Sequence, residues 1–248
     1  MEFLSFNLRI DLESDGINRF DLRLPHIARF LDEGAYPLVC TQEVDPSMLR
    51  RLLQAMPRYR SVGLPRDDGR GEGTPILYDP KKLTLERAET RWLTETPAVP
   101  STLPGSRFPR IAVIAVFRTP RGRRFRVVST HLDYGEASVR LRQTDILLGL
   151  VAKEQSADPL PCLVLGDFNA EPDEPLHRAF RRARFRSAYG AMIPAHTFHA
   201  FGNAAAASTI DYVYGRGVRF KDARVLPSAP YGRFLSDHDP VWVECNFR

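Results

Sequence analysis

Short runs of apolar residues recur along the whole chain, and each is followed by polar or turn-forming residues. Runs of this length, either alternating or continuously apolar, are typical of β-strands. Residues 119–122, Thr-Pro-Arg-Gly, separate two of these runs and predict a hairpin connection. The pattern predicts strands at residues 3–7, 38–42, 59–64, 75–78, 83–92, 111–118, 124–130, 163–166, 210–214, 218–225 and 241–247.

A helical period is present in a few other segments. Leu24, Ile27 and Leu31, for example, fall on one face of a helix because they are three and four residues apart. Helices are expected at residues 22–33, 46–56, 137–154 and 175–183. Many strands with a few interspersed helices indicate an α/β fold in which two packed sheets carry helices on their outer faces. Since no repeat or linker interrupts the pattern, we expect a single domain over residues 1–248.

Composition narrows the class of protein. The chain has 248 residues, of which 43% are hydrophobic, enough for one sizeable core. Its three cysteines, Cys40, Cys162 and Cys245, lie far apart in apolar stretches and are expected to be buried free thiols. No apolar run approaches the roughly 20 residues that span a bilayer. The first residues lack the features of a signal peptide, so we expect a cytoplasmic protein without a membrane partner.

Charge suggests the kind of partner. The formal net charge is +5 and the isoelectric point about 9.3, and nearly all the positive charge is arginine. Such a balance favours polyanionic partners, DNA or RNA above all. An arginine-rich solvated surface would give the same numbers. Five arginines at residues 178–186 pose the same choice between a solvated face and a nucleic-acid track.

Polar residues that can bind metal ions or transfer protons follow several of the predicted strands. Any one of these groups could be ordinary turn chemistry, because Asp and Asn cap exposed backbone groups after strands. A glycine before Asp167 allows a tight turn that aims the carboxylate off the sheet edge. The groups are Gln42-Glu43, Thr130-His131-Leu132-Asp133, Gly166-Asp167-Phe168-Asn169, Asp211-Tyr212 and, before the last strand, Ser236-Asp237-His238.

Electrostatics suggests why these residues would occur together. Side chains at the ends of adjacent strands can converge, because the strands lie about 4.8 Å apart. Carboxylates gathered at one point would repel by about 3–4 kcal/mol per pair, so a cation is expected among them. Oxygen ligation by Glu43, Asp237 and the amide oxygen of Asn7, with Asp167 as a further candidate ligand, suits Mg²⁺ or Mn²⁺ better than zinc. Such an ion polarises a phosphoryl oxygen and activates water, and nearby histidines supply donors and a proton-transfer partner.

The same residues, taken in order from Asn7 to His238, resemble the endonuclease/exonuclease/phosphatase superfamily with its DNase I-like fold. The resemblance runs from Phe3 to the last strand. It implies a four-layered α/β sandwich, with two mainly antiparallel sheets inside and helices outside. It also implies an enzyme that hydrolyses phosphate esters with the help of a divalent metal ion.

The resemblance further implies a role for each residue. Glu43 would be the principal metal ligand, with Asn7 beside it and Asp237 near the ion. Asp167 would orient or deprotonate the attacking water and Asn169 would position it, while Asp211 would orient one of the two imidazoles. The remaining expected phosphate contacts are His131, His238 and Arg110.

Two positions depart from the nuclease branch that cuts at abasic sites. That branch commonly has an acid where this chain has Arg9, and a tyrosine where it has His131. The chain also lacks an obvious insertion that could grip a duplex. These differences move the expectation away from DNA repair without affecting the hydrolytic chemistry.

Three functions remain open from the sequence. Nucleic-acid phosphodiesters are the favoured substrates, because the chain is basic. A small molecule or lipid headgroup carrying a phosphate ester is the alternative, and a non-enzymatic binding module is a remote third. No obligate protein partner is evident.

Several further residues are given ordinary roles. His26 and His177 are expected near the surface, and His196 and His199 in a loop or lining a cleft. Residues 67–70, Asp-Asp-Gly-Arg, are expected to form a turn or an edge of the substrate site.

Overall fold

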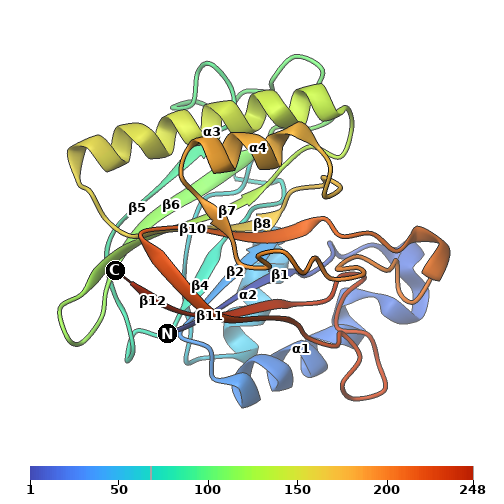
Figure 1. Ribbon diagram of the computed structural model, residues 1–248. Helices are drawn as coiled ribbons and strands as arrows, with labels where there is room; N and C mark the ends of the chain where they lie inside the picture. The colour runs from blue at the N-terminus through green and yellow to red at the C-terminus, as the bar shows by residue number, and fades with distance from the viewer. Residues whose placement is uncertain (68, 248) are drawn as a thin grey trace.

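The protein is described by a computed structural model covering residues 1–67 and 69–247. Asp68, which belongs to the turn expected at residues 67–70, lies outside the described residues, as does Arg248. The described chain forms two six-stranded sheets packed face to face, with helices on their outer sides (Figure 1). This is the four-layered sandwich that the sequence predicts.

The first sheet has the strand order β11-β12-β1-β2-β4-β3, and the second has the order β5-β6-β7-β8-β10-β9. Each sheet contains one parallel pair, β1 with β2 and β7 with β8, and the other neighbours are antiparallel. The strands are β1 (Glu2–Asn7), β2 (Leu38–Gln42), β3 (Arg60–Val62), β4 (Ile76–Tyr78), β5 (Thr84–Trp92), β6 (Ile111–Arg118), β7 (Arg124–His131), β8 (Cys162–Asp167), β9 (Arg186–Ser187), β10 (Asp211–Arg216), β11 (Val218–Val225) and β12 (Val241–Phe247).

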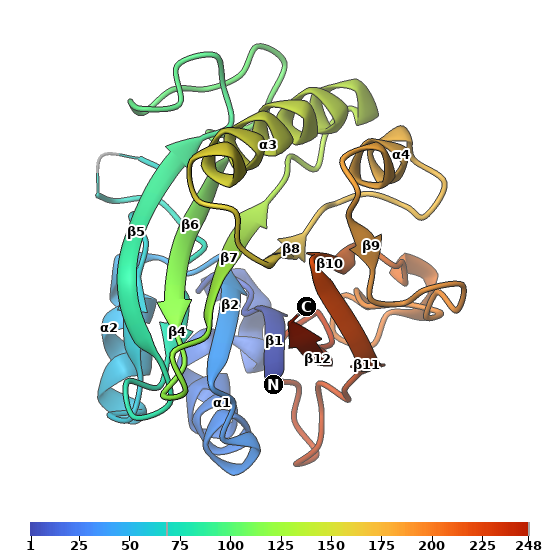
Figure 2. The same cartoon turned by 60° about the vertical axis from the view of Figure 1, so that its left-hand side comes forward.

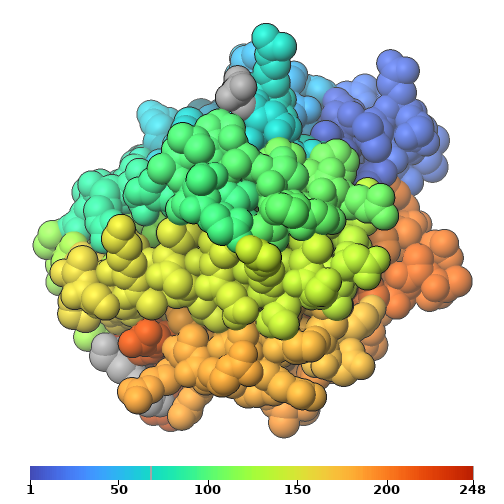
Figure 3. All heavy atoms as spheres, turned by 90° about the horizontal axis from the view of Figure 1, so that it is seen from above, coloured from blue at the N-terminus to red at the C-terminus, as the bar shows by residue number. Residues whose placement is uncertain are grey.

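The helices form the two outer layers. Figure 2 shows α1 and α2 beside the first sheet, and α3 and α4 beside the second. Figure 3 looks onto the second of these layers, where α3 crosses the face and α4 lies next to it in orange. The helices are α1 (Phe20–Gly34), α2 (Pro46–Ala55), α3 (Ala137–Ala157) and α4 (Pro175–Arg182), with short 3-10 turns η1 (Glu13–Asn18) and η2 (Ala204–Ala206). The start of α2 follows from its sequence, because Asp45 accepts hydrogen bonds from the backbone N–H groups of Ser47 and Met48.

Two apolar cores hold the layers together. The larger core lies between the sheets, where the rings of Phe3, Phe125 and Phe247 pack against one another. The smaller core lies between the first sheet and its helices and includes Ile27 and Leu52. All three cysteines are buried free thiols, as expected.

The structure differs from the predicted elements mainly in short pieces. The two-residue strand β9 was not predicted, because Arg186 and Ser187 show no apolar pattern and form a strand only by pairing with β10. Helix α3 ends three residues later than expected, at Ala157. Among the described residues, no helix combines the length and hydrophobicity needed to cross a bilayer.

Candidate active site

The parallel pair in each sheet explains why residues distant in sequence meet. The carboxyl ends of parallel neighbours lie at the same edge, so Asn7 lies opposite Gln42, next to Glu43, and His131 lies opposite Asp167. Strand β10 is antiparallel to β8, and its first residue, Asp211, therefore also lies opposite Asp167. The chain before β12 then adds Ser236, Asp237 and His238.

Gly166 is required for a reason that the sequence did not suggest. The residue lies inside β8 rather than in a tight turn, so the turn expected before Asp167 is wrong. A Cβ atom at this position would lie 2.0 Å from the carbonyl oxygen of Thr130. Glycine therefore allows β7 and β8 to approach where His131 and Asp167 leave the sheet.

Asn7 joins the carboxylates of the two sheets. Its amide nitrogen donates to Glu43 Oε1 and to Asp167 Oδ2, each at 3.0 Å. Its amide oxygen, which was expected to ligate a metal, accepts a hydrogen bond from the backbone N–H of Arg9 at 2.9 Å. Glu43 also accepts from the backbone N–H of Ile10 through its second oxygen, and its backbone φ of 58° places it in the left-handed region. A non-glycine residue held in that conformation is often found at functional sites.

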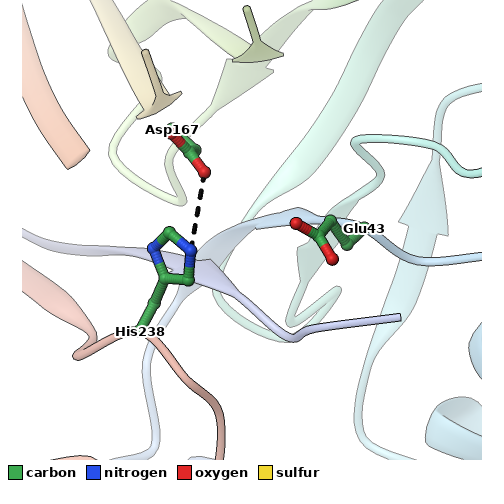
Figure 4. Close-up of side chains that lie close together, drawn as sticks. All are labelled: Glu43, Asp167 and His238. Atoms are coloured by element: carbon green, nitrogen blue, oxygen red, sulfur yellow. Dashed lines mark ion pairs between the residues drawn. The ribbon is translucent and has the colours of Figure 1, made fainter. Parts of the chain in front are cut away.

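His238 is the imidazole oriented by Asp211. Its Nδ1 lies 2.8 Å from Asp211 Oδ2, and its Nε2 lies 3.7 Å from Asp167 Oδ2. Burial opposes a charge on this ring, but the contacts with Asp211 and the nearby carboxylates of Asp167 and Asp237 raise the pKa of His238 to about 10. The sequence left open whether Asp211 pairs with His131 or His238, and the structure pairs it with His238. Figure 4 shows Glu43 turned toward the His238–Asp167 pair from the other side of the site.

His131 has the opposite character. Burial and the nearby Arg110 lower its pKa well below the usual value, so the ring is neutral. Its Nε2 lies 2.9 Å from the amide nitrogen of Asn169 and 3.5 Å from Asp167 Oδ2. Asn169 also donates to the carbonyl of Leu132, and its backbone N–H donates to Asp167 Oδ1. The two histidines therefore flank Asp167, one charged and one neutral.

The carboxylates are buried without enough positive charge to match them. Burial and the neighbouring Asp211 raise the pKa of Asp167 to about 7. Burial also raises the pKa of Asp237, and the charge of Glu43 adds to this effect. Asp237 lies 3.7 Å from Arg9 Nε, but that guanidinium also pairs with Asp15 at 3.0 Å. A cluster with raised carboxyl pKa values is one that a cation would stabilise.

Glu43, Asp167 and His238 each present an atom within 4.8 Å of the others, which is close enough to hold a metal ion. We expect His238 to be less suited to this role than the carboxylates, because Asp211 holds it as a cation and a metal ligand must be a neutral imidazole. The donors that remain are oxygens, and oxygen donors fit a hard divalent ion.

A cavity of about 520 Å³ opens over these residues. All the expected site residues line it except Asn7 and Asp211, which lie behind the cavity wall and hold Glu43, Asp167 and His238. Arg110 lines it but is 4% exposed and lies 3.6 Å from Asp133. The remaining lining residues are Arg9, Ile10, Arg66, Glu72, Phe108, Tyr134, Arg140, Glu171, Glu174, Phe198, Ser208 and Ile210.

Sequence reasoning did not find several of these wall residues. Glu72 lies two residues beyond residues 67–70, which were expected to form a turn or an edge of the substrate site, and this was the one available signal. Arg140 and Glu174 give no local signal, because they meet only when α3 packs beside α4, where their side chains are 2.6 Å apart. His199 does not line this cavity and instead bonds Ser228 at 2.7 Å, and His177, expected near the surface, is 5% exposed.

Comparison with known proteins identifies the family of this chain. The model of the Endonuclease/Exonuclease/phosphatase family matches residues 4–238. Nocturnin from Drosophila melanogaster is 32% identical in an alignment of 154 positions that covers 56% of this chain. The match spans 22% of that protein, so this chain corresponds to about a fifth of its length.

Solved structures match over the full length. A functionally unknown conserved protein from Enterococcus faecalis V583 has a TM-score of 0.92 at 29% identity, covering 100% of both chains. The mannosyl-6-phosphatase of Bacteroides thetaiotaomicron VPI-5482 has a TM-score of 0.91 at 27% identity, again covering 100% of both chains.

Proposed function

The chain belongs to the endonuclease/exonuclease/phosphatase family and is a phosphoesterase of that family, and from this premise we propose that it hydrolyses a compact, hydroxyl-bearing phosphate ester with the help of a divalent metal ion. A sugar phosphate is the kind of substrate meant. The non-enzymatic alternative is not pursued, because every expected catalytic position is filled.

The main support for this proposal is that the arginines of the active-site cavity wall are paired with carboxylates. Four arginines line the cavity, and each lies within 4 Å of a carboxylate. A nucleic-acid groove instead presents unpaired cations along a phosphate backbone. The pairs are Arg9–Asp15 at 3.0 Å, Arg66–Glu72 at 3.1 Å, Arg110–Asp133 at 3.6 Å and Arg140–Glu174 at 2.6 Å.

The acids on the wall also favour hydroxyl groups over further phosphates. Glu171 faces the cavity and forms no ion pair with the described residues, so its carboxylate can accept hydrogen bonds from a polyol while repelling a second phosphate. The name of the Bacteroides relative, a mannosyl-6-phosphatase, supports the same substrate class. The nucleic-acid substrate favoured from the sequence therefore becomes the second candidate.

The residues of the site divide the chemistry. Positively charged His238 would bind a phosphoryl oxygen and stabilise the charge that develops on it. Asp167, with its raised pKa, would accept a proton from the attacking water, and Asn169 would hold the water in place. Glu43 and Asp237 would hold the ion beside Asp167, and when bound, Mg²⁺ or Mn²⁺ would supply Lewis-acid polarisation of the phosphoryl group.

The experiment that tests the proposal compares substrates by kcat/KM with Mg²⁺, Mn²⁺ or EDTA. The panel contains mannose 6-phosphate, p-nitrophenyl phosphate, bis(p-nitrophenyl) phosphate and single- and double-stranded oligonucleotides. We expect metal-dependent hydrolysis that is fastest for the sugar phosphate and lost in Glu43→Gln and Asp167→Asn. A higher kcat/KM for oligonucleotides would reject the substrate class, and turnover in EDTA would reject the metal dependence.

Nucleic acid remains the second candidate because of one feature at the cavity mouth. The rings of Phe108 and Tyr134 lie 6.1 Å apart and are 40% and 56% exposed. Exposed aromatic rings of this kind can stack on bases. The oligonucleotide arm of the panel tests this possibility directly.

A further inference from the structure

A second cavity lies outside the active site, between helix α4 and the strands at the edge of the second sheet. Its volume is about 330 Å³, at the lower end of the range for small-molecule sites. Figure 2 shows α4 and β9 next to each other at this edge. We call it the α4 cavity, and it is lined by Pro172, His177, Arg181, Phe185, Arg186, Ser187, Gly190, Ile193, Tyr212 and Tyr214.

The rim of the α4 cavity carries positive charge that the protein does not neutralise. Residues 178–186 contain five arginines, all exposed: Arg178, Arg181, Arg182, Arg184 and Arg186. None of them lies within 4 Å of a carboxylate oxygen of the described residues, in contrast to the four paired arginines of the active site. An anion bound among these unpaired cations would be stabilised. Arg181 and Arg186 line the cavity itself.

The floor of the α4 cavity is aromatic, and its polar atoms are already bonded inside the protein. The hydroxyl of Tyr212 donates to the carbonyls of Ala170 and Thr209, and that of Tyr214 lies 2.5 Å from His177 Nδ1. His177 Nε2 lies 2.8 Å from the carbonyl of Glu171. The floor therefore offers carbon atoms rather than hydrogen-bonding groups, and it suits an apolar or planar part of a ligand.

The α4 cavity does not continue the active site. Pro172 lines the α4 cavity, whereas its neighbours Glu171 and Glu174 line the active-site cavity. This short segment also carries Asp173, so a negatively charged strip separates the two cavities. A phosphate chain running from one cavity to the other would have to cross three acids.

We propose that the α4 cavity is a binding site for a nucleoside phosphate, either a free nucleotide or the terminal nucleotide of a strand. Arg181 and Arg186 would bind the phosphate, and the base would lie over the aromatic and apolar floor. Both the phosphate and the base of the ligand are needed, because the arginines of the rim favour an anion and the aromatic floor favours a planar ring. The proposal does not depend on the substrate of the active site.

The test measures binding of AMP to the full chain by calorimetry in EDTA and low salt, so that hydrolysis does not intervene. We expect Arg181→Glu/Arg186→Glu to weaken binding at least tenfold. Arg121→Glu/Arg219→Glu, which removes two exposed arginines elsewhere without an ion pair among the described residues, is the matched control and should change the Kd less than twofold. Arg181→Gln/Arg186→Gln serves as the milder variant, and thermal unfolding checks that each protein is folded.

Further arms identify the ligand and its source. Inorganic phosphate and ribose 5-phosphate should bind at least tenfold more weakly than AMP, because they lack the base. A single-stranded hexanucleotide that binds more tightly than AMP would assign the site to strand ends, and the reverse order would assign it to free nucleotides. His238→Gln in the active site should leave AMP binding at the α4 cavity unchanged.

The proposal is overturned by any of four results. AMP could fail to bind, or its binding could be lost in His238→Gln and kept in the α4 variants. The matched control could weaken binding as much as the α4 variant, which would show attraction to net charge alone. Equal affinity for phosphate and AMP would reject the nucleoside part of the ligand.

Discussion

At the scale of single residues, the site separates two histidines by their surroundings. His238 faces Asp211 and is held as a cation, whereas His131 faces Asn169 and Arg110 and is held neutral. The same side chain can therefore serve two purposes around one carboxylate, Asp167.

The first prediction concerns the pH dependence of activity. The pKa of His238 is raised to about 10, so its positive charge is present below that pH and is lost as the pH rises through it. We expect kcat/KM to fall above about pH 10 in the wild type. Asp211→Asn removes the carboxylate that holds the proton, so the alkaline limb should move toward neutral pH. A pH profile of kcat/KM for both proteins measures the shift, and an unmoved alkaline limb would show that His238 does not act as a cation.

The second prediction concerns Arg23, whose side chain is completely buried. Its guanidinium donates to the backbone carbonyls of Leu8 and Leu235 at 2.6 and 2.7 Å, and to those of Arg9 and Asn18. Leu8 follows Asn7 and Leu235 precedes Ser236, so Arg23 holds together two segments that carry site residues. We expect Arg23→Lys to lower kcat at least tenfold, because a compact ammonium cannot bond all four carbonyls.

Arg126 provides the matched control for Arg23. It is also completely buried and bonds the carbonyls of Glu154 and Asp158, far from the cavity-lining residues. Arg126→Lys should lower the unfolding temperature to a similar degree while kcat stays within twofold. Steady-state kinetics and thermal unfolding of both variants, compared side by side, decide whether Arg23 positions the site or only stabilises the fold.

At the scale of elements, the important feature is the parallel pair within each mainly antiparallel sheet. These pairs bring Asn7 beside Glu43 and His131 beside Asp167 at one edge. Strand β10 runs antiparallel to β8, and its first residue, Asp211, therefore lies at the same edge of the sheet as Asp167. The residues of the site come from several strands and loops, and their positions therefore depend on how closely the strands of each parallel pair approach one another.

The third prediction tests the approach of β7 and β8. Gly166→Ala would place a Cβ atom 2.0 Å from the Thr130 carbonyl oxygen, so a backbone must move. We expect a loss of about 3 kcal/mol in the free energy of unfolding, at the upper end of overpacking effects. Activity should fall as well, because His131 and Asp167 follow these residues directly.

Gly149 in α3 is the contrasting position. A Cβ atom there would meet nothing within 4 Å, and the residue lies inside a helix. Gly149→Ala should therefore stabilise the protein by about 0.5–1 kcal/mol. Denaturant unfolding of the two alanine variants compares them, and equal effects would mean that close strand approach is not what Gly166 provides.

At the scale of the whole molecule, stability and metal binding are linked through the buried carboxylates. Asp167 has a pKa raised to about 7, so deprotonating it costs stability as the pH rises from its unfolded value near 4 to about 7. Above pH 7 that cost is complete, and a cation bound beside the carboxylate would offset it.

The fourth prediction follows from this linkage. Mn²⁺ at about 100 times its Kd should raise the unfolding temperature at pH 8 by roughly 5–10 °C, and by less at pH 5, where Asp167 stays protonated. EDTA should reverse the shift, and Glu43→Gln should abolish most of it. Scanning calorimetry at the two pH values measures the effect. A shift that is as large at pH 5 as at pH 8, or unchanged in Glu43→Gln, would place the ion elsewhere.

The sequence by itself determined the layered fold, nearly all the strands and the residues that gather at the sheet edge. These features are local, because each predicted strand is a short apolar run in the sequence and each site residue directly follows or precedes such a run. Asp167 and His238, for example, are covalently attached to strand ends that the pattern already locates.

Only the tertiary structure decided which partners these residues have. The pairing of Asp211 with His238, the buried Arg23 and the Arg140–Glu174 contact join residues distant in the chain, and nothing in their local sequence distinguishes them. The need for Gly166 and the unpaired charge around the α4 cavity likewise appear only when neighbouring elements are in place. The physical reason is that pKa values, ion pairs and cavities depend on burial and on distances between residues that are far apart in the chain. The alternation of apolar and polar residues that specifies a strand involves only residues that are neighbours in the sequence.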